Sequence, residues 1–214
     1  MTRVLLTAFE PFGGDSVNPS ERAVADVVAV HPPGVEVVSS RLSCVFSVAL
    51  DELTAAVART EPDVVICTGQ AGGRPDVTVE RIAINVDDAR IPDNAGRQPV
   101  DRPVVEGGPA AYFSTLPVKA CVAAARAAGV PASVSQTAGT FVCNHVFYGL
   151  MHLMATQRPH MRGGFVHLPY APEQVTDRAQ PSLPVTLAAE GLRAVVTAAA
   201  SRTEDIVVAG GATH

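Results

Sequence analysis

The stretch that decides the fold is residues 132–156, ASVSQTAGTFVCNHVFYGLMHLMAT. Its first part, residues 132–136, is typical of a short strand, and residues 144–156 carry apolar side chains at helical spacing. Gly139 lies in the loop between them, because glycine interrupts both periodicities. The stretch therefore predicts a strand, a loop and a helix, and it sets one cysteine, Cys143, where the helix begins.

The same alternation of strands and helices continues on both sides of this stretch. The expected strands are residues 3–8, 35–42, 64–68, 77–85, 132–136 and 164–168. The expected helices are residues 19–30, 48–58, 117–128, 144–156 and 185–200. Most of these strands are continuous apolar runs, which is typical of a sheet covered on both faces. We therefore predict an α/β fold, a three-layer α/β/α sandwich with a mostly parallel, twisted central sheet.

Composition limits the class of protein. Apolar residues make up 47% of the 214 residues and charged residues 17%, which is typical of a packed globular chain. We expect one domain over residues 1–214, with a mobile tail at about residues 201–214. A net charge of −5 argues against nucleic acid as a partner. The sequence has no apolar run of about 18 residues and no signal-peptide pattern at its start, so we expect a protein that is not in a membrane.

The four cysteines indicate a reducing compartment. They lie at positions 44, 67, 121 and 143, without CxxC spacing and without the dense framework of secreted proteins. We expect a cytoplasmic protein without metal or cofactor. Cys44, Cys67 and Cys121 lie in or next to expected strands or on a helix face and are interpreted as core residues.

Cys143 is the candidate nucleophile. A thiol at a helix N-terminus lies near unpaired N–H groups and the positive end of the helix dipole, which are expected to lower its pKa. The same N–H groups can bind an oxyanion. A buried structural cysteine is the alternative, and position alone does not decide between the two.

A cysteine nucleophile needs a base and a group that orients the base. His167 ends an apolar strand and is the best-placed base, whereas His145 is so close to Cys143 in sequence that we expect it to pack. Glu80 is the candidate acid, because it is the one carboxylate in an otherwise apolar strand. The alternatives are that Glu80 pairs with Arg81, or that Asp87 or its neighbour Asp88 is the acid.

Other chemistries lack their motifs. The sequence contains no GxSxG, no GxxxxGK[ST], no HExxH and no GxGxxG after a strand. In open α/β sheets ligands bind at the carboxyl ends of the strands, where residues 9–14, residues 69–74, Cys143 and His167 are all expected.

The chain resembles the type I pyroglutamyl peptidases, also called pyrrolidone-carboxylate peptidases. Five blocks carry the resemblance: LLTAFEPFGGDSVNPS, CTGQAGGR, VERIAINVDDARIPDNAG, GTFVCNHVFYGLMH and GFVHLPYAPEQ. They run in order from residue 5 to about residue 174. One departure lies at Ser43, near which the family more often has a proline.

The resemblance implies an α/β/α cysteine peptidase that removes N-terminal pyroglutamate (5-oxoproline) from peptides, and that assembles as a homotetramer or homodimer. The implied catalytic residues are Cys143 as nucleophile, His167 as base and Glu80 as acid, with Arg90 at the oxyanion. The implied ring pocket consists of Phe9, Phe12, Gln70, Ile91, Phe141 and Val142.

Two other functions stay open from the sequence. The first is a catalytically silent protein that binds pyroglutamyl N-termini without cleaving them. The second, suggested by fold class alone, is an enzyme similar to nucleoside phosphorylases. This second function needs a phosphate site, for which Gly72, Gly73 and Arg74 are the candidates.

Overall fold

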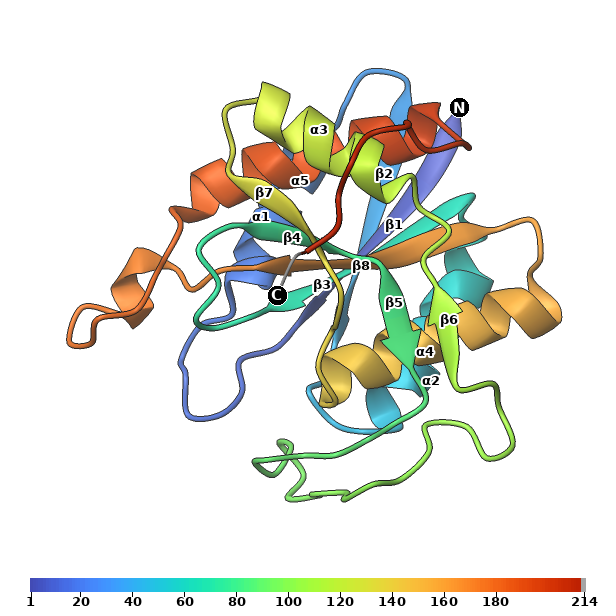
Figure 1. Ribbon diagram of the computed structural model, residues 1–214, viewed down its shortest axis with the longest axis vertical. Helices are drawn as coiled ribbons and strands as arrows, with labels where there is room; N and C mark the ends of the chain where they lie inside the picture. Colours follow the sequence, from blue (N-terminus) through green and yellow to red (C-terminus); the bar gives the residue numbers. More distant parts are fainter. Residues whose placement is uncertain (213–214) are drawn as a thin grey trace.

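A computed structural model of the protein describes residues 1–212. Its centre is a six-stranded sheet with the order β2-β1-β3-β8-β4-β7 (Figure 1). The strands of this sheet are β1 (Thr2–Phe9), β2 (Val35–Leu42), β3 (Val64–Gln70), β4 (Val77–Glu80), β7 (Ala132–Ser135) and β8 (Arg162–Leu168). β5 (Ile82–Ile84) and β6 (Ala111–Phe113) form a separate antiparallel pair.

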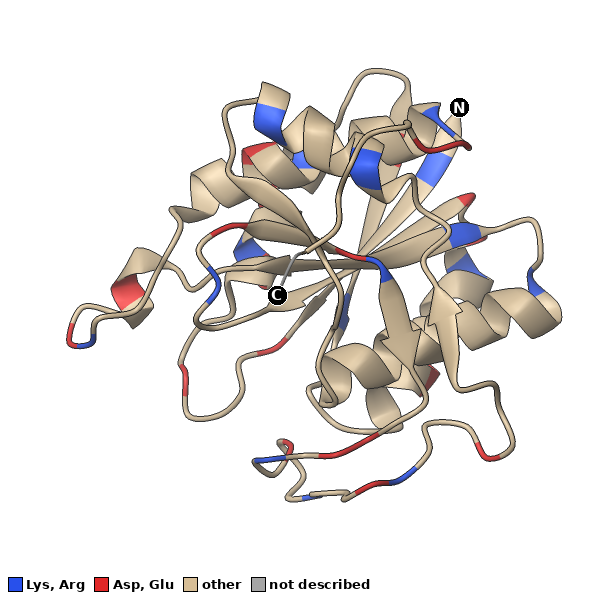
Figure 2. Ribbon diagram, in the orientation of Figure 1, with Lys and Arg blue, Asp and Glu red and all other residues tan. Residues whose placement is uncertain are grey.

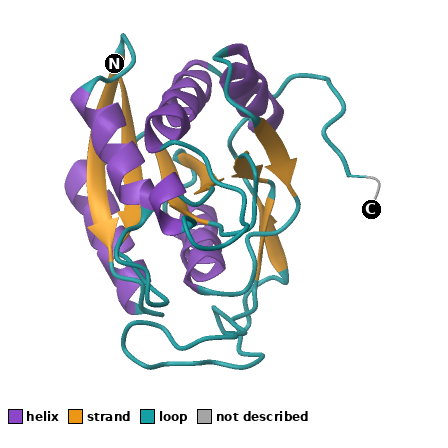
Figure 3. Cartoon of the chain, turned by 90° about the vertical axis from the view of Figure 1, so that its left-hand side faces the viewer, coloured by secondary structure: helices purple, strands orange, loops and turns teal. Residues whose placement is uncertain are grey.

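Helices cover both faces of the sheet, and Figure 3 shows strands lying between them. They are α1 (Pro19–Ala29), α2 (Val48–Thr60), α3 (Val118–Ala127), α4 (Val142–Gln157) and α5 (Val185–Ser201), and a short 3-10 helix, η1, spans Pro172–Gln174. Helices α1, α3 and α5 share one apolar core with the sheet, and α2 and α4 share the other. The predicted three-layer α/β/α sandwich is confirmed.

The strands supply both cores because their side chains alternate between the two faces. Val4 and Leu6 of β1 belong to the core under α1, α3 and α5, whereas Leu5 belongs to the core under α2 and α4. Val64 and Val65 of β3 divide in the same way. This explains why the strands read as continuous apolar runs.

The sheet is mostly parallel, as predicted. β1 pairs in parallel with β2 and β3, and β3 pairs in parallel with β8. The exception is β4, which pairs antiparallel with β8 and places Thr78 opposite His167. The carboxyl ends of β1, β3 and β8 therefore lie at the same edge of the sheet.

The predicted strand over residues 77–85 is two strands instead of one. Arg81 separates them: its N–H donates to Ser135 of the β7 edge, and its carbonyl accepts from Ser114 beyond β6. β4 thus stays in the central sheet, while β5 leaves it to pair with β6. The sequence alone does not reveal this change of partner, because both halves have the same apolar character.

Two long segments flank this frame. Residues 85–110 connect β5 to β6 as a loop that extends away from the body at the bottom of Figure 1. In the tail, Asp205 accepts hydrogen bonds from the backbone of Lys119 and Ala120 at the start of α3, and Gly210 accepts one from Arg81. The expected mobility of residues 213–214 lies outside the described residues.

Candidate active site

A cavity of about 390 Å³ opens at the carboxyl ends of β3 and β8. Its lining comes from five segments that are far apart in the sequence, and it includes both Cys143 and His167. The other lining residues are Phe12, Gln70, Ala71, Gly72, Arg74, Asp88, Arg90, Ile91, Ala138, Gly139, Thr140 and Phe141. Its volume lies in the usual range for small-molecule sites.

Cys143 is the second residue of α4, which begins two residues earlier than the predicted helix over residues 144–156. The helix begins as the chain leaves an extended conformation at Phe141. Asn144 fixes this start, because its side chain bonds the backbone of Ile84 and Val86. Cys143 is partly exposed at the cavity, whereas Cys44, Cys67 and Cys121 are buried.

The pKa of the Cys143 thiol differs from the sequence-based expectation. Burial raises this pKa well above its usual value, and the Glu80 carboxylate raises it further, while the Arg74 guanidinium lowers it. The helix N-terminus was expected to lower the thiol pKa, and in this structure the loss of hydration outweighs that effect. The resting group is therefore the neutral thiol.

Gly69 makes room for this thiol. It lies opposite His167 in the β3–β8 pairing, and a Cβ atom at this position would be 2.9 Å from Cys143 Sγ and 3.1 Å from the ring of Phe165. We expect Gly69→Ala to displace the thiol and to lower the free energy of unfolding by about 1–3 kcal/mol, as overpacking does. Thermal unfolding and the rate of Cys143 alkylation measure the two effects. An unchanged alkylation rate would contradict this close fit.

His167 and Glu80 form a buried pair. Nδ1 of His167 is 2.7 Å from Oε1 of Glu80, and the two side chains are 4% and 0% exposed. The pairing follows from the register, because Thr78 lies opposite His167 and the side chain two residues later on β4 lies on the same face. The ring of Phe165 packs against that of His167 with centroids 4.6 Å apart.

The charge states of this pair follow from its surroundings. Burial lowers the pKa of His167, and although the Glu80 carboxylate raises it, the pKa stays below its usual value. Burial raises the pKa of Glu80, but hydrogen bonding from His167 and the charge of Arg74 bring this pKa below its usual value. At neutral pH Glu80 is therefore ionised and His167 neutral. Its Nδ1–H donates to Glu80, which leaves the Nε2 lone pair to accept a proton.

The cation beside Glu80 is Arg74 instead of Arg81. Nη1 of Arg74 is 2.6 Å from Glu80 Oε1, whereas Arg81 donates to the carbonyl of Gly210. The sequence offered Arg74 only as a phosphate ligand, and its guanidinium is engaged with a carboxylate here. Its location in a glycine-rich loop before Glu80 was the signal that could have suggested this pair.

The second His–acid pair in the structure is His145 with Asp87. His145 Nδ1 is 2.8 Å from Asp87 Oδ2, and its Nε2 accepts a hydrogen bond of 3.1 Å from the N–H of Ser47. Both ring nitrogens are therefore engaged, and His145 packs as expected. Asp88, the other alternative acid, is exposed at the cavity rim.

Four of the six residues assigned to the ring pocket line the cavity: Phe12, Gln70, Ile91 and Phe141. Phe12 and Phe141 pack with ring centroids 5.9 Å apart. Arg90, assigned to the oxyanion, also lines the cavity. Phe9 and Val142 lie beneath it in the apolar core, where they are 1% and 0% exposed.

Gln70 is held in place by the loop before α1 and by η1. Its Nε2 donates to Asp15 at 3.0 Å, and its Oε1 accepts from Gln174 at 2.8 Å. Gln174 also donates to Asp15, so the three side chains form one network. Sequence analysis assigned no role to Gln174, which lies in the proline-rich segment that follows β8.

Phe46 packs behind Phe141, one of the aromatic rings that line the cavity. Its ring meets Phe141 edge-on at 5.3 Å. In the segment before it, the N–H and the hydroxyl of Ser43 both donate to the Glu52 carboxylate. This segment is anchored further by a hydrogen bond from the N–H of Cys44 to Glu10. Ser43, where a departure from the resembled family was expected, therefore lies in a hydrogen-bonded segment behind the cavity wall.

The described residues show two further features. None of the helices in residues 1–212 is both long and apolar enough to cross a bilayer. No group of three or more His, Cys, Asp or Glu side chains in that part of the chain is arranged to hold a metal ion. Acidic and basic residues are interspersed along the ribbon (Figure 2).

Together the fold and the site define a class of protein, the α/β cysteine hydrolases, in which a thiol and an acid-paired imidazole face one cavity. Comparison with known proteins names the family. The family model for pyroglutamyl peptidase matches residues 2–202. The chain belongs to the pyroglutamyl peptidase family, a family of cysteine peptidases.

Its relatives are similar over their whole length. The pyrrolidone-carboxylate peptidase of Streptomyces coelicolor is 64% identical, and that of Pectobacterium atrosepticum is 56% identical, each over 100% of both chains. Among solved structures, pyroglutamyl peptidase I from Bacillus amyloliquefaciens matches with a TM-score of 0.96 at 47% identity, covering 97% of this chain and 99% of that one. The pyrrolidone carboxyl peptidase of Thermococcus litoralis matches with a TM-score of 0.92 at 35% identity, covering 98% of this chain and 100% of that one.

Proposed function

We propose that the protein removes an N-terminal pyroglutamate from peptides, with Cys143 as nucleophile, His167 as base and Glu80 as the acid that orients the base. The observation that carries this proposal is that the Glu80-paired imidazole and the Cys143 thiol line the same cavity. Family membership supplies the substrate class, since the relatives are pyroglutamyl peptidases.

The first half of the reaction begins with a neutral thiol and a neutral imidazole. Nε2 of His167 takes the thiol proton as Sγ of Cys143 attacks the carbonyl carbon of the pyroglutamyl peptide bond. The charge on Glu80 stabilises the imidazolium that forms. First-turn N–H groups of α4, which have no intrahelical acceptor, and Arg90 bind the oxyanion, at about 3 kcal/mol per donor.

In the second half, imidazolium His167 gives its proton to the leaving amine, and the peptide leaves without its first residue. The remaining acyl group is a thioester on Cys143. Neutral His167 then takes a proton from water, which attacks the thioester, and gives this proton to the departing sulfur, so that pyroglutamate and the Cys143 thiol are released. Atoms and protons balance, and the enzyme returns to its starting state.

The cavity suits a neutral lactam ring. Phe12, Ile91 and Phe141 give apolar walls, and Gln70 offers an amide for the lactam. An N-terminal pyroglutamate has no ammonium group, so the site needs no carboxylate to bind one. Phe9 and Val142, also assigned to this pocket, support it from the core beneath.

Release of a chromogenic amine from a pyroglutamyl amide tests the proposal, with and without a thiol alkylator. We expect turnover that the alkylator removes. The same amide with a free N-terminal glutamate, which is open and charged, serves as the matched control and should not be cleaved. Binding without turnover by reduced, folded protein would favour the catalytically silent alternative.

Glu80→Gln tests the role of the acid through its pH dependence. The carboxylate raises the pKa of His167, so its removal lowers that pKa further. The acid limb of the kcat/KM profile, where His167 loses its proton, is then expected to move to lower pH. The plateau is expected to fall by about 10³–10⁴-fold, because an amide no longer stabilises the imidazolium or fixes its tautomer. An acid limb that moves to higher pH would contradict this role.

We also propose that residues 1–214 act as one peptidase domain, in the cytoplasm, as a homotetramer or homodimer. Four free cysteines and a mechanism that needs a reduced thiol support a reducing compartment. Light scattering of the purified protein measures the assembly, and a monomer at all concentrations would refute it.

A further inference from the structure

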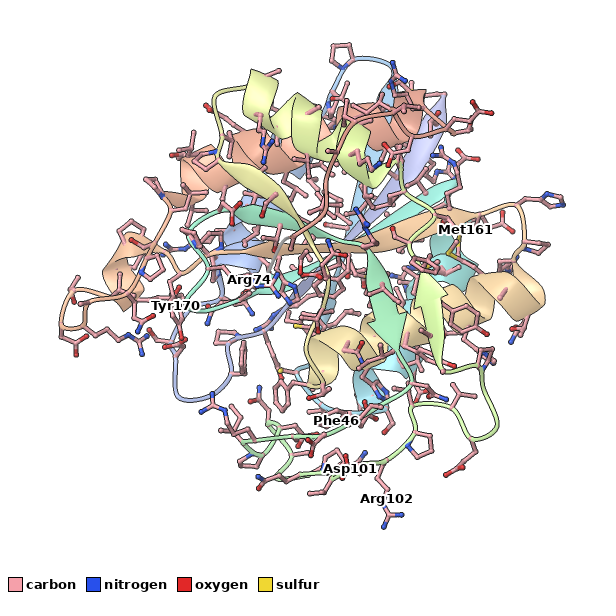
Figure 4. The ribbon with its side chains drawn as sticks, in the orientation of Figure 1. Phe46, Arg74, Asp101, Arg102, Met161 and Tyr170 are labelled. Carbon is pink, nitrogen blue, oxygen red and sulfur yellow. The ribbon has the colours of Figure 1, made fainter. Side chains whose placement is uncertain are left out.

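Arg74 has no role in the chemistry described so far, although it lines the cavity with Cys143 and His167. It lies in the loop between β3 and β4, inward of Tyr170 (Figure 4). Its side chain is 26% exposed, while its partner Glu80 is fully buried. Arg74 therefore brings a permanent, largely buried positive charge into the cavity that holds the Cys143 thiol.

The guanidinium group of Arg74 makes three hydrogen bonds, one of which reaches the acid. Nη1 is 2.6 Å from Glu80 Oε1, the same oxygen that accepts from His167, and 2.5 Å from the hydroxyl of Thr78. Nη2 donates to the carbonyl of Thr137 at 2.8 Å. Arg74 thus links β4 to the loop that leads into α4 and Cys143. A lysine ammonium lacks this planar fork and cannot reproduce the set of contacts.

The buried carboxylate depends on this cation. Glu80 Oε2 has no hydrogen-bond partner among the described residues, and Oε1 receives the hydrogen bonds of both His167 and Arg74. A buried carboxylate without compensation becomes protonated, and a protonated Glu80 could not stabilise an imidazolium. His167 is neutral at rest, which leaves Arg74 as the permanent charge that balances Glu80.

The charges facing His167 come from several elements. Glu80 faces it from β4, Arg74 from the β3–β4 loop and Cys143 from α4, and Asp88 and Arg90 line the same cavity. Burial lowers the pKa of His167, Glu80 raises it and Arg74 lowers it. Arg74 therefore offsets the effect of the carboxylate, which alone would favour the imidazolium.

We propose that Arg74 is a positioning residue of this site: it keeps Glu80 ionised while holding His167 in its neutral form, and it ties this pair to the loop before the nucleophile. The inference rests on the proposed function, since it assigns Arg74 to the same reaction. Arg74 acts through Glu80 and His167 and takes no proton itself.

Two substitutions of Arg74 separate the effect of its charge from the effect of its hydrogen-bond geometry. Arg74→Gln removes the cation, so kcat is expected to fall about 10- to 100-fold, the usual effect of losing a group that orients a reacting residue. Without the cation the coupled Glu80–His167 pair takes up a proton more readily, so the acid limb of kcat/KM should move to higher pH, opposite to the shift in Glu80→Gln. Arg74→Lys keeps the charge, and is expected to lose kcat while its acid limb stays near that of the unsubstituted protein. Arg41→Gln, which removes an exposed arginine paired with Glu21, is the matched control and should change neither.

A second readout does not require peptidase activity. Arg74 lowers the pKa of the Cys143 thiol, so iodoacetamide should alkylate Cys143 more slowly at neutral pH in Arg74→Gln than in Arg74→Lys. If the unsubstituted protein fails to cleave pyroglutamyl amides, the proposed function is wrong, and the alkylation rates still decide the role of Arg74. Equal losses of kcat in both variants with an unmoved acid limb, or equal alkylation rates, would overturn the inference.

If Arg74→Gln does not fold, the Arg74→Gln, Glu80→Gln double variant replaces it, because this removes the buried charge and its counterion together. It is compared with Glu80→Gln alone. The acid limb should again move to higher pH when Arg74 is lost, since the guanidinium acts on His167 directly as well as through Glu80. An unmoved limb would overturn the inference here too.

Discussion

Cys143→Ala is expected to abolish turnover of a pyroglutamyl amide, a loss of roughly 10⁴-fold or more, because no other group can form the acyl intermediate. The fold should remain, since the substitution removes a single sulfur from a partly exposed site. We expect the free energy of unfolding to change by no more than about 1 kcal/mol. Steady-state kinetics and chemical denaturation on the same preparation measure both quantities.

The other three cysteines are the matched controls. Burial raises the pKa of Cys44, Cys67 and Cys121 to about 12 in each case, so these thiols are protonated and inert at neutral pH. Cys44→Ala, Cys67→Ala and Cys121→Ala are expected to stay active. Normal activity in Cys143→Ala would contradict the assignment of the nucleophile. Loss of activity in one of the controls with an intact fold would contradict it as well.

His167→Ala is the second large effect. It removes the only imidazole that lines the cavity among residues 1–212, and with it the proposed acceptor of the thiol proton and the proposed donor to the leaving amine. Because the thiol pKa is raised by burial, little thiolate forms without a base. We expect kcat to fall on the order of 10³-fold or more, with a smaller change in KM. Single-turnover measurements of amine release follow the acylation step directly.

His145→Ala is the control for this substitution. His145 bonds Asp87 through one ring nitrogen and the backbone of Ser47 through the other, so its loss should destabilise the fold more than it slows the chemistry. A lowered thermal midpoint with a modest loss of kcat is the expected result. A larger loss of kcat in His145→Ala than in His167→Ala would mean that the base was assigned to the wrong histidine.

Much of the site could be predicted from the sequence because its residues break local patterns. Cys143 follows a glycine-containing loop and begins a helix, His167 ends an apolar strand, and Glu80 is a carboxylate among apolar neighbours. Each anomaly is visible within a few residues. The resemblance to the pyroglutamyl peptidases then supplied the pocket residues, of which Phe9 and Val142 lie in the core beneath the cavity.

What could not be predicted depends on contacts between distant segments. Arg74 meets Thr137 across 63 positions, and Gln174 meets Gln70 across 104, so no local periodicity signals either contact. The separation of β4 from β5 at Arg81 has the same origin, because the partner strand decides where a strand leaves a sheet. The pKa of Cys143 is also a tertiary property, since burial by several elements outweighs the effect of its helix.

The sequence by itself determined the layered α/β/α fold, the helix that begins beside Cys143 and the residue types of the candidate catalytic group. These follow from hydrophobic periodicity and turn residues, which act over short distances along the chain. Only the tertiary structure decided which cation balances Glu80, which histidine keeps a free nitrogen and which aromatic rings reach the cavity. Burial and charge balance depend on every segment packed around a group, and that packing exists only in the folded protein.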